Sequence, residues 1–417
     1  MSNSMDEMLI PPNAKRGRNS ETETEIEDNK DRLSDLHDCI LLHILSFLSA
    51  KYAVRTCMLS KRWKDLWKRL PNLILLSSDF DTFKFFTKFV STILTRRDGK
   101  TALHTLEFER VGSIQSPLIK RIVNYAVSRN VQRLGIDVEF DMQHLLPCIF
   151  TCHTLTSLKL IVYPKGYSRG STLLPESLNL PALTTLHLGK FTFCSSGNNR
   201  ADPFSAFKRL KSLIIDRCDL KDAETLYISS LTLVSLALLD PPSQTFYKVE
   251  LSTPCLHRLA CTGSPSLYLD DSGLSSVQEV DIDIDMYSYS PVPPLILLCW
   301  LQGFVNVRSL TVSTNTLQVL SLVPGLLKYK LPSLTNMKRL KIKREPLSED
   351  LKMIKIVMIN REREATESRK EAAKLRKEAD LLWKNRRTLT APLPDGIVDF
   401  LIQNSPSAEV EIIDCLC

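Results

Sequence analysis

The sequence predicts an α/β fold in which a small helical unit near the N-terminus is followed by a repeat solenoid. Two observations support this prediction. An apolar pattern recurs ten times between residues 103 and 342, whereas the apolar residues of segment 31–70 are spaced as in short helices. Hydrophobic residues make up 43% of the 417 residues and aromatic residues only 7%, so leucine dominates the apolar set. We expect a parallel sheet on the concave side of the solenoid, with helices and loops outside.

Residues 1–30 are predicted to be a disordered tail, because Ser, Asn, Thr and Glu dominate and large apolar residues are few. The tail contains a short basic cluster, Lys15, Arg16 and Arg18, which is a candidate signal for nuclear import. The alternative is a solvated tail with incidental charges. The expected location is intracellular, in the nucleus, the cytoplasm or both.

The helical unit is predicted over residues 31–72. Ser34 can cap its first helix, whose apolar residues share one face: Leu36, Ile40, Ile44, Leu45 and Leu48. A second short helix is expected around residues 52–57. Ser60 can cap a third, which places Trp63 and Trp67 one turn apart. Three helices in about 40 residues bury too little apolar surface to be stable alone, so we expect a partner to cover part of this unit.

The repeat array is predicted over residues 73–345. Each unit has an apolar residue, two variable residues, a Leu or its equivalent, one variable residue and an apolar residue. The ten units begin at Leu103, Val131, Leu155, Leu183, Leu210, Leu233, Leu256, Val277, Val307 and Met337. The intervals are 28, 24, 28, 27, 23, 23, 21, 30 and 30 residues, which is close to the period of leucine-rich repeats. In each unit the last two apolar residues alternate on a short strand, so both should point into the core.

Other elements of the array follow from local signals. A strand is expected at residues 73–76 and an amphipathic helix at 79–97. Ser116-Pro117 should open an outer helix that runs to Arg129. Loops are expected at Pro241-Pro242 and at residues 291–294.

A charged helical insertion is predicted over residues 346–390. Residues 360–387 contain ten basic and six acidic residues with almost no apolar stripe, which indicates a solvated helix laced with ion pairs. Contact with nucleic acid or an acidic partner, through Trp383 and its basic neighbours, is an alternative, and a coiled-coil partner is another. Residues 391–417 are predicted to form a capping repeat, with a helix at 397–402 and a strand at 410–413.

The N-terminal unit resembles the F-box, in particular that of plant F-box/leucine-rich-repeat proteins. The resemblance rests on residues 31–36, 40–48 and 54–63, with Trp67 following. It implies a small helical bundle that docks a Skp-type adaptor, and through it a cullin. By resemblance, the residues in or supporting that interface are Leu36, Ile40, Ile44, Leu45, Leu48, Leu59 and Trp63.

One residue departs from the family pattern. The family usually has Pro after the Leu at position 36, whereas this sequence has His37. Proline at the start of a helix preorganises the backbone, so its absence is expected to cost up to about 1 kcal/mol.

The leading functional hypothesis is a substrate-recognition subunit of an SCF-type ubiquitin ligase, without catalytic residues of its own. The repeats would hold a protein target that the other subunits ubiquitinate. Two alternatives remain open: a receptor in which a small molecule completes the target surface, and an interaction scaffold that acts outside a ligase.

Composition argues against other classes of function. No nucleophile–base set or glycine-rich phosphate loop is visible, and no cofactor is expected. Eleven cysteines form no CxxC pair, so a metal site is not expected. Asp281, Asp283 and Asp285 share one face of a predicted strand; they could form an acidic patch or metal site, or a solvent-facing strand edge. The apolar run at residues 295–301 is too short to cross a membrane, and a net charge of +7 permits nucleic acid without indicating it.

Overall fold

The computed structural model describes residues 33, 35–163, 172–175, 178–242, 247–270, 273–286, 292–331, 333–346, 348–365, 373–374, 376–377 and 393–414. The chain divides into two compact units, Met1–Ser168 and Arg169–Cys417, and each is described by itself. The predicted tail, including Lys15, Arg16 and Arg18, and the predicted cap Ser34 lie outside the described residues.

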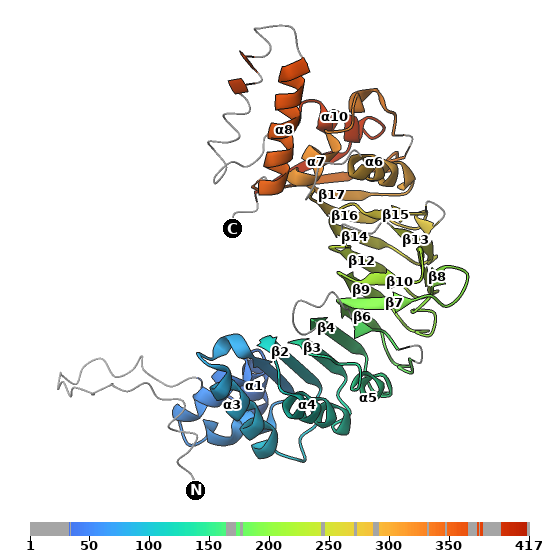
Figure 1. Ribbon diagram of the computed structural model, residues 1–417. Coiled ribbons are helices and arrows are strands. Elements are labelled where there is room, and N and C mark those ends of the chain that lie inside the picture. The colour runs from blue at the N-terminus through green and yellow to red at the C-terminus, as the bar shows by residue number, and fades with distance from the viewer. Residues whose placement is uncertain are drawn as a thin grey trace, which may run out of the picture. The chain divides into compact units, whose positions relative to one another are not determined.

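Unit 1 begins with short helices and continues as an alternation of strands and helices (Figure 1). The helical start contains α1 (Asp38–Leu45), α2 (Ala50–Arg55), and the 3-10 helices η2 (Thr56–Met58) and η3 (Trp63–Arg69). The following elements are β1 (Asn72–Leu76), η4 (Ser77–Asp79), α3 (Phe83–Arg96), β2 (Thr105–Ser113), α4 (Ser116–Ser128), β3 (Arg133–Glu139), α5 (Leu146–Phe150) and β4 (Ser157–Tyr163).

Three helices of unit 1 differ from the prediction in their start or type, and α1 has His37 at its N-cap where Ser34 was predicted. The helix expected from residue 79 begins at Phe83, because the hydroxyl of Thr82 accepts a hydrogen bond from the Phe85 amide and caps it. The third helix of the F-box-like segment is a 3-10 helix. The outer helix α4 starts at Ser116, with Pro117 in its first turn, as predicted.

The four strands of unit 1 form a parallel sheet in the order β1-β2-β3-β4. Leu106 pairs with Leu134, and Leu134 with Leu158, so the repeat leucines stand in one buried row. Helices α3, α4 and α5 lie along one side of the sheet (Figure 1), where Phe86 stacks on Phe108 with ring centroids 5.6 Å apart. The opposite face carries the alternating polar residues.

Unit 2 continues the same architecture with an inner parallel sheet in the order β6-β9-β12-β14-β16-β17-β18-β19. Its strands are β6 (Thr185–Gly189), β9 (Ser212–Asp216), β12 (Ser235–Leu239), β14 (Arg258–Gly263), β16 (Glu279–Ile284), β17 (Ser309–Ser313), β18 (Arg339–Arg344) and β19 (Glu409–Asp414). The two apolar residues of each repeat strand from β6 to β18 are buried, which confirms their inward orientation.

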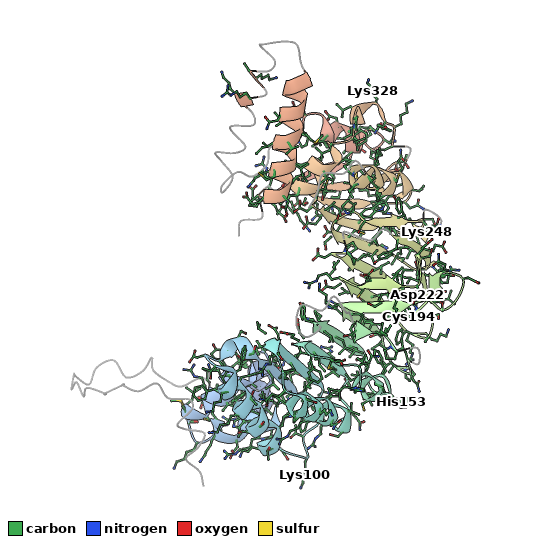
Figure 2. All side chains as sticks on the ribbon, in the orientation of Figure 1. Lys100, His153, Cys194, Asp222, Lys248 and Lys328 are labelled. Carbon is green, nitrogen blue, oxygen red and sulfur yellow. The ribbon has the colours of Figure 1, made fainter. Side chains whose placement is uncertain are left out.

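The outer layer of unit 2 is built largely from strands, whereas helices and loops were predicted there. These strands form two small parallel sheets: β5 (Thr172–Leu173), β7 (Phe191–Cys194) and β10 (Asp219–Lys221), and β8 (Arg200–Ala201), β11 (Thr225–Ser229), β13 (Tyr247–Ser252) and β15 (Leu267–Leu269). Figure 2 shows Cys194, Asp222 and Lys248 on this outer side of the unit. The repeats here span 21–27 residues, shorter than the 30-residue repeats that follow, and alternation such as Val249-Glu250-Leu251 favours a strand.

Helices return where the repeats lengthen to 30 residues. They are α6 (Val292–Gly303), α7 (Thr314–Leu320), the 3-10 helix η6 (Leu326–Lys328), α8 (Glu349–Ala365) and α10 (Ile397–Ile402). The predicted loop at residues 291–294 is therefore wrong for the described residues 292–294, because Pro293 and Pro294 stand in the first turn of α6, where proline is tolerated. The helix at 397–402 and a strand spanning 410–413 are as predicted.

The charged insertion is only partly described. Helix α8 starts at Glu349, eleven residues before the predicted charged stretch, and Leu351 and Ile354 are buried. Trp383 and its basic neighbours lie outside the described residues. The nine cysteines among the described residues are free thiols. No described helix combines the length and apolarity needed to cross a membrane.

The end of β14 supplies a stability test. Gly263 has φ +86°, and a Cβ there would lie 2.7 Å from the Asp240 Cα. Gly263→Ala is expected to lower the free energy of unfolding by about 2 kcal/mol or more, because backbone strain and a backbone clash add. Gly325→Ala is the control: its φ is also positive, but the nearest atom is 3.7 Å away, so only the strain of about 1 kcal/mol applies. Urea unfolding followed by circular dichroism measures both, and equal effects would contradict the clash.

Candidate functional site

The helical start of unit 1 exposes an unusual number of large apolar side chains. Seven residues within this short segment form what we call the exposed apolar set: Ile40, Ile44, Phe47, Leu48, Tyr52, Met58 and Leu59. Phe47 is 72% exposed, Leu59 65% and Met58 61%, so these side chains stand almost free of the domain core. Exposed apolar residues gathered in one small unit indicate a protein-binding surface.

The set includes four of the seven residues expected at the adaptor interface: Ile40, Ile44, Leu48 and Leu59. Leu36 is half-buried. Leu45 and Trp63 are only 1% and 4% exposed, so they can support a surface from within but cannot contact a partner directly.

Three exposed residues were missed by sequence reasoning: Phe47, Tyr52 and Met58. Phe47 follows the end of α1 by two residues and lies in the turn after it, although its spacing from Ile40 and Ile44 also fits their helical face. Met58 lies in the 3-10 helix η2, whose different period moves side chains away from α-helical positions. The available signal was the density of large apolar residues between 40 and 59, which exceeds what so small a core can bury.

The core beneath this surface is compact and aromatic. Leu41, Leu45 and Ala53 are buried together with Trp63 and Trp67, which come from η3. The two tryptophans supply much of the apolar volume that the four short helical segments share. This core holds the exposed apolar set in place without covering it.

An ion-pair network joins the start of α1 to η3. Asp38 accepts hydrogen bonds from Arg62 Nε at 3.1 Å and Nη2 at 3.0 Å, and from Arg69 Nη1 at 3.1 Å. Arg62 Nη2 also donates to the Leu36 carbonyl oxygen. The hydrogen bond from Arg62 is the largest of the causes that hold the pKa of Asp38 below its ordinary value.

His37, where the family has proline, occupies the N-cap of α1. Its φ of −64° is the value that proline would impose, and its carbonyl oxygen accepts from the Ile40 amide at 3.0 Å. The side chain makes no capping hydrogen bond. The helix therefore starts as it would with proline, but without the preorganisation of the unfolded chain.

Two of the three aspartates at 281, 283 and 285 make side-chain contacts within unit 2. Lys343 Nζ lies 2.9 Å from Asp281 Oδ2, and Ser348 Oγ donates to Asp285 at 2.7 Å. Burial, together with Asp350 and Asp283, raises the pKa of Asp285. Within the described part of the chain, no group of three or more His, Cys, Asp and Glu residues is arranged to hold a metal ion.

The Asp38 network yields a pH-dependent prediction. Because its pKa is lower in the folded state, Asp38 contributes stability above its unfolded pKa of about 4, which is lost as pH falls through the folded value. Asp38→Asn should therefore speed hydrogen exchange of the α1 amides at pH 7, and this difference from the wild type should vanish well below pH 4. Asp35→Asn is the control, since Asp35 forms no ion pair with the described residues. An Asp38→Asn effect that persists unchanged in acid would contradict the assignment.

Comparisons with known proteins identify the domain that carries these residues. Residues 33–75 match the F-box domain model. The chain is 29% identical to the F-box/LRR-repeat protein At4g14103 of Arabidopsis thaliana, over 71% of this chain and 81% of that protein. It is 27% identical to F-box/LRR-repeat protein 13 of Arabidopsis thaliana, over 70% of this chain and 67% of that protein. It is 28% identical to the F-box/FBD/LRR-repeat protein At1g78750 of the same plant, again over 70% of this chain and 67% of that protein. The chain thus carries an F-box domain at residues 33–75, and over about 70% of its length it is similar to F-box/LRR-repeat proteins of Arabidopsis thaliana.

Proposed function

We propose that this protein is the substrate-recognition subunit of an SCF-type cullin ubiquitin ligase. The F-box domain docks a Skp-type adaptor, and the leucine-rich repeats bind a protein that the complex ubiquitinates. The observation that carries the proposal is the exposed apolar set on the F-box domain, together with the family to which that domain belongs.

The exposed apolar set supports docking on energetic grounds. Burying a large aliphatic or aromatic side chain is worth roughly 1.5–3 kcal/mol, so a partner that covered several members would gain a large part of a stable interface. Residues such as Phe47 and Leu59 are mostly exposed, so their burial contributes little to the stability of the isolated unit. A protein partner gives these side chains a physical role.

The repeats support the second half of the proposal. In unit 2 the solvent-facing positions of the inner strands carry mixed charge, such as Asp281 on β16 and Lys343 on β18. A parallel sheet presents such positions as regular rows about 5 Å apart, which suits recognition of an extended protein surface.

The chain would position the target and would supply no catalytic group. Holding the target beside the ubiquitin-loaded enzyme of the ligase raises its effective concentration there, which accelerates transfer without a catalytic group in this subunit.

A nuclear location is part of the proposal. It rests on Lys15, Arg16 and Arg18, which form a short basic cluster of the kind that import receptors bind. Changing all three to alanine in a full-length fluorescent fusion is expected to reduce nuclear fluorescence severalfold relative to the wild type. The charge-matched control is Lys61, Lys64 and Arg96 changed to alanine, and an equal loss in both would contradict the signal.

Adaptor docking is tested by reversing the polarity of the surface. Phe47→Lys with Leu59→Lys should reduce co-purification with a Skp-type adaptor by about a hundredfold or more, because both side chains are exposed and fold stability does not depend on them. Leu231→Lys is the matched control, since Leu231 is 77% exposed but belongs to the repeats. Undiminished binding by the Phe47/Leu59 double variant would overturn the docking surface. Changes at Leu45 or Trp63 are poorer tests, because these residues are buried and their loss would unfold the domain.

A further inference from the structure

The inner sheet of unit 2 ends at β19, and one edge of that strand is open. Among the described residues, β19 pairs with β18 alone, in a continuous register from Arg339 opposite Glu409 to Arg344 opposite Asp414. All six residues of β19 are exposed, although the preceding strands of the same sheet bury their apolar pairs. The second edge of β19 is therefore accessible to another strand.

The backbone of β19 directs unpaired polar groups toward this edge. The Glu409 amide donates to the Lys338 carbonyl oxygen at 2.9 Å, so the peptide groups of Glu409 face β18. Successive residues of a strand point their peptide groups to opposite sides, so those of Val410 and Ile412 face the open edge. Each of these residues offers one N–H donor and one C=O acceptor. A row of this kind is the template to which an added strand bonds.

One face of the open edge is apolar. Val410 and Ile412 hold the positions at which β18 carries Leu340 and Ile342. The two β18 residues are fully buried, whereas Val410 and Ile412 remain more than one-third exposed. Removing apolar surface from water is favourable, so a strand with apolar residues beside this pair would extend the core by one more row.

The opposite face of β19 is acidic. Glu409 pairs with Arg339 at 3.8 Å, and Glu411 pairs with Lys341 at 3.2 Å. Both carboxylates are about half exposed or more, and a carboxylate has room for several hydrogen bonds. Basic side chains on an added strand would therefore find acceptors on this face.

The first strand of unit 1 shows that the chain can cover an edge by itself. Among the described residues β1 pairs with β2 alone, yet its Leu73 and Leu75 are buried, and helix α2 of the F-box domain lies against it. Strand β19 also lacks the features that prevent edge strands from pairing. It contains neither Pro nor Lys, and its register with β18 has no bulge.

We propose that β19 binds an extended segment of the protein target by strand addition, and that this segment alternates apolar with basic residues. The inference rests on the proposed function, in that the repeats hold a protein target. The apolar residues of the segment cover Val410 and Ile412, while its basic residues pair with Glu409 and Glu411 on the other face.

Charge argues against a second copy of the chain as the added strand. Strand β19 has three acidic residues and no basic one. Pairing two copies would bring carboxylates close to carboxylates across the strands, which is destabilising. A segment with basic residues meets no such repulsion.

The binding test uses the full-length chain co-expressed with a Skp-type adaptor. The probes are two libraries of ten-residue peptides, in which Val or Ile alternates with Lys or Arg in one and with Glu or Asp in the other. Fluorescence polarisation should show that wild-type protein binds the basic library about tenfold more tightly, since each cross-strand pair changes from attraction to repulsion in the acidic one. The net charge of +7 would by itself favour the acidic library, so a basic preference requires a local acidic surface.

Two matched double variants locate that surface. Glu409→Gln with Glu411→Gln should lower the preference to about twofold or less. Glu107→Gln with Glu109→Gln is the control and should leave the preference unchanged. It removes two exposed carboxylates at the same spacing from β2, which β1 and β3 flank on both sides.

Hydrogen exchange resolved to single amides tests the pairing itself. In the free protein the amides of Val410 and Ile412 should exchange at least about tenfold faster than that of Glu411, whose peptide groups face β18. Saturation with the tightest-binding peptide of the basic library should slow exchange at Val410 and Ile412 at least about tenfold.

Slow exchange at Val410 and Ile412 in the free protein would overturn the proposal, because the chain would then cover its own edge. The same holds for absent binding, for a preference that survives the Glu409/Glu411 double variant, and for fast exchange in the peptide complex. A concentration-dependent dimer that protects these amides would overturn it in favour of a second copy. The adaptor is quantified in each sample: its absence would count against the ligase proposal alone, while peptide binding at β19 would still support strand addition.

Discussion

The repeat region depends on one constraint: each strand must bury its pair of apolar side chains against the strands beside it. Leu310 and Val312 on β17, for example, are almost fully buried between neighbouring repeats. The last strand shows what happens at the end of such a row. On β19, Val410 and Ile412 hold the equivalent positions but are 39% and 46% exposed, because β18 is the sole strand paired with β19 among the described residues. Stability in a solenoid is therefore shared between neighbours.

The F-box domain has no such row of repeating neighbours. Its short helices cannot cover one another, so two tryptophans build a small core while several other apolar residues remain in solvent. The ion pairs at Asp38 act between the segments of this core, and their exposure keeps their individual energies small. In the proposed complex the adaptor would cover these exposed residues of the F-box domain, whereas the repeats cover one another.

Sequence periodicity predicted the parts of the fold in which burial repeats at a fixed interval. The inner strands, the outer helix at residue 116 and the helix at 397–402 are all present. The outer strands and the start of α6 were not anticipated, because the local choice there depends on how much chain each repeat has to spare. In the F-box domain the spacing identified the face with Ile40 and Ile44 but could not separate buried Leu45 and Trp63 from exposed Phe47, since that depends on where each short helix ends.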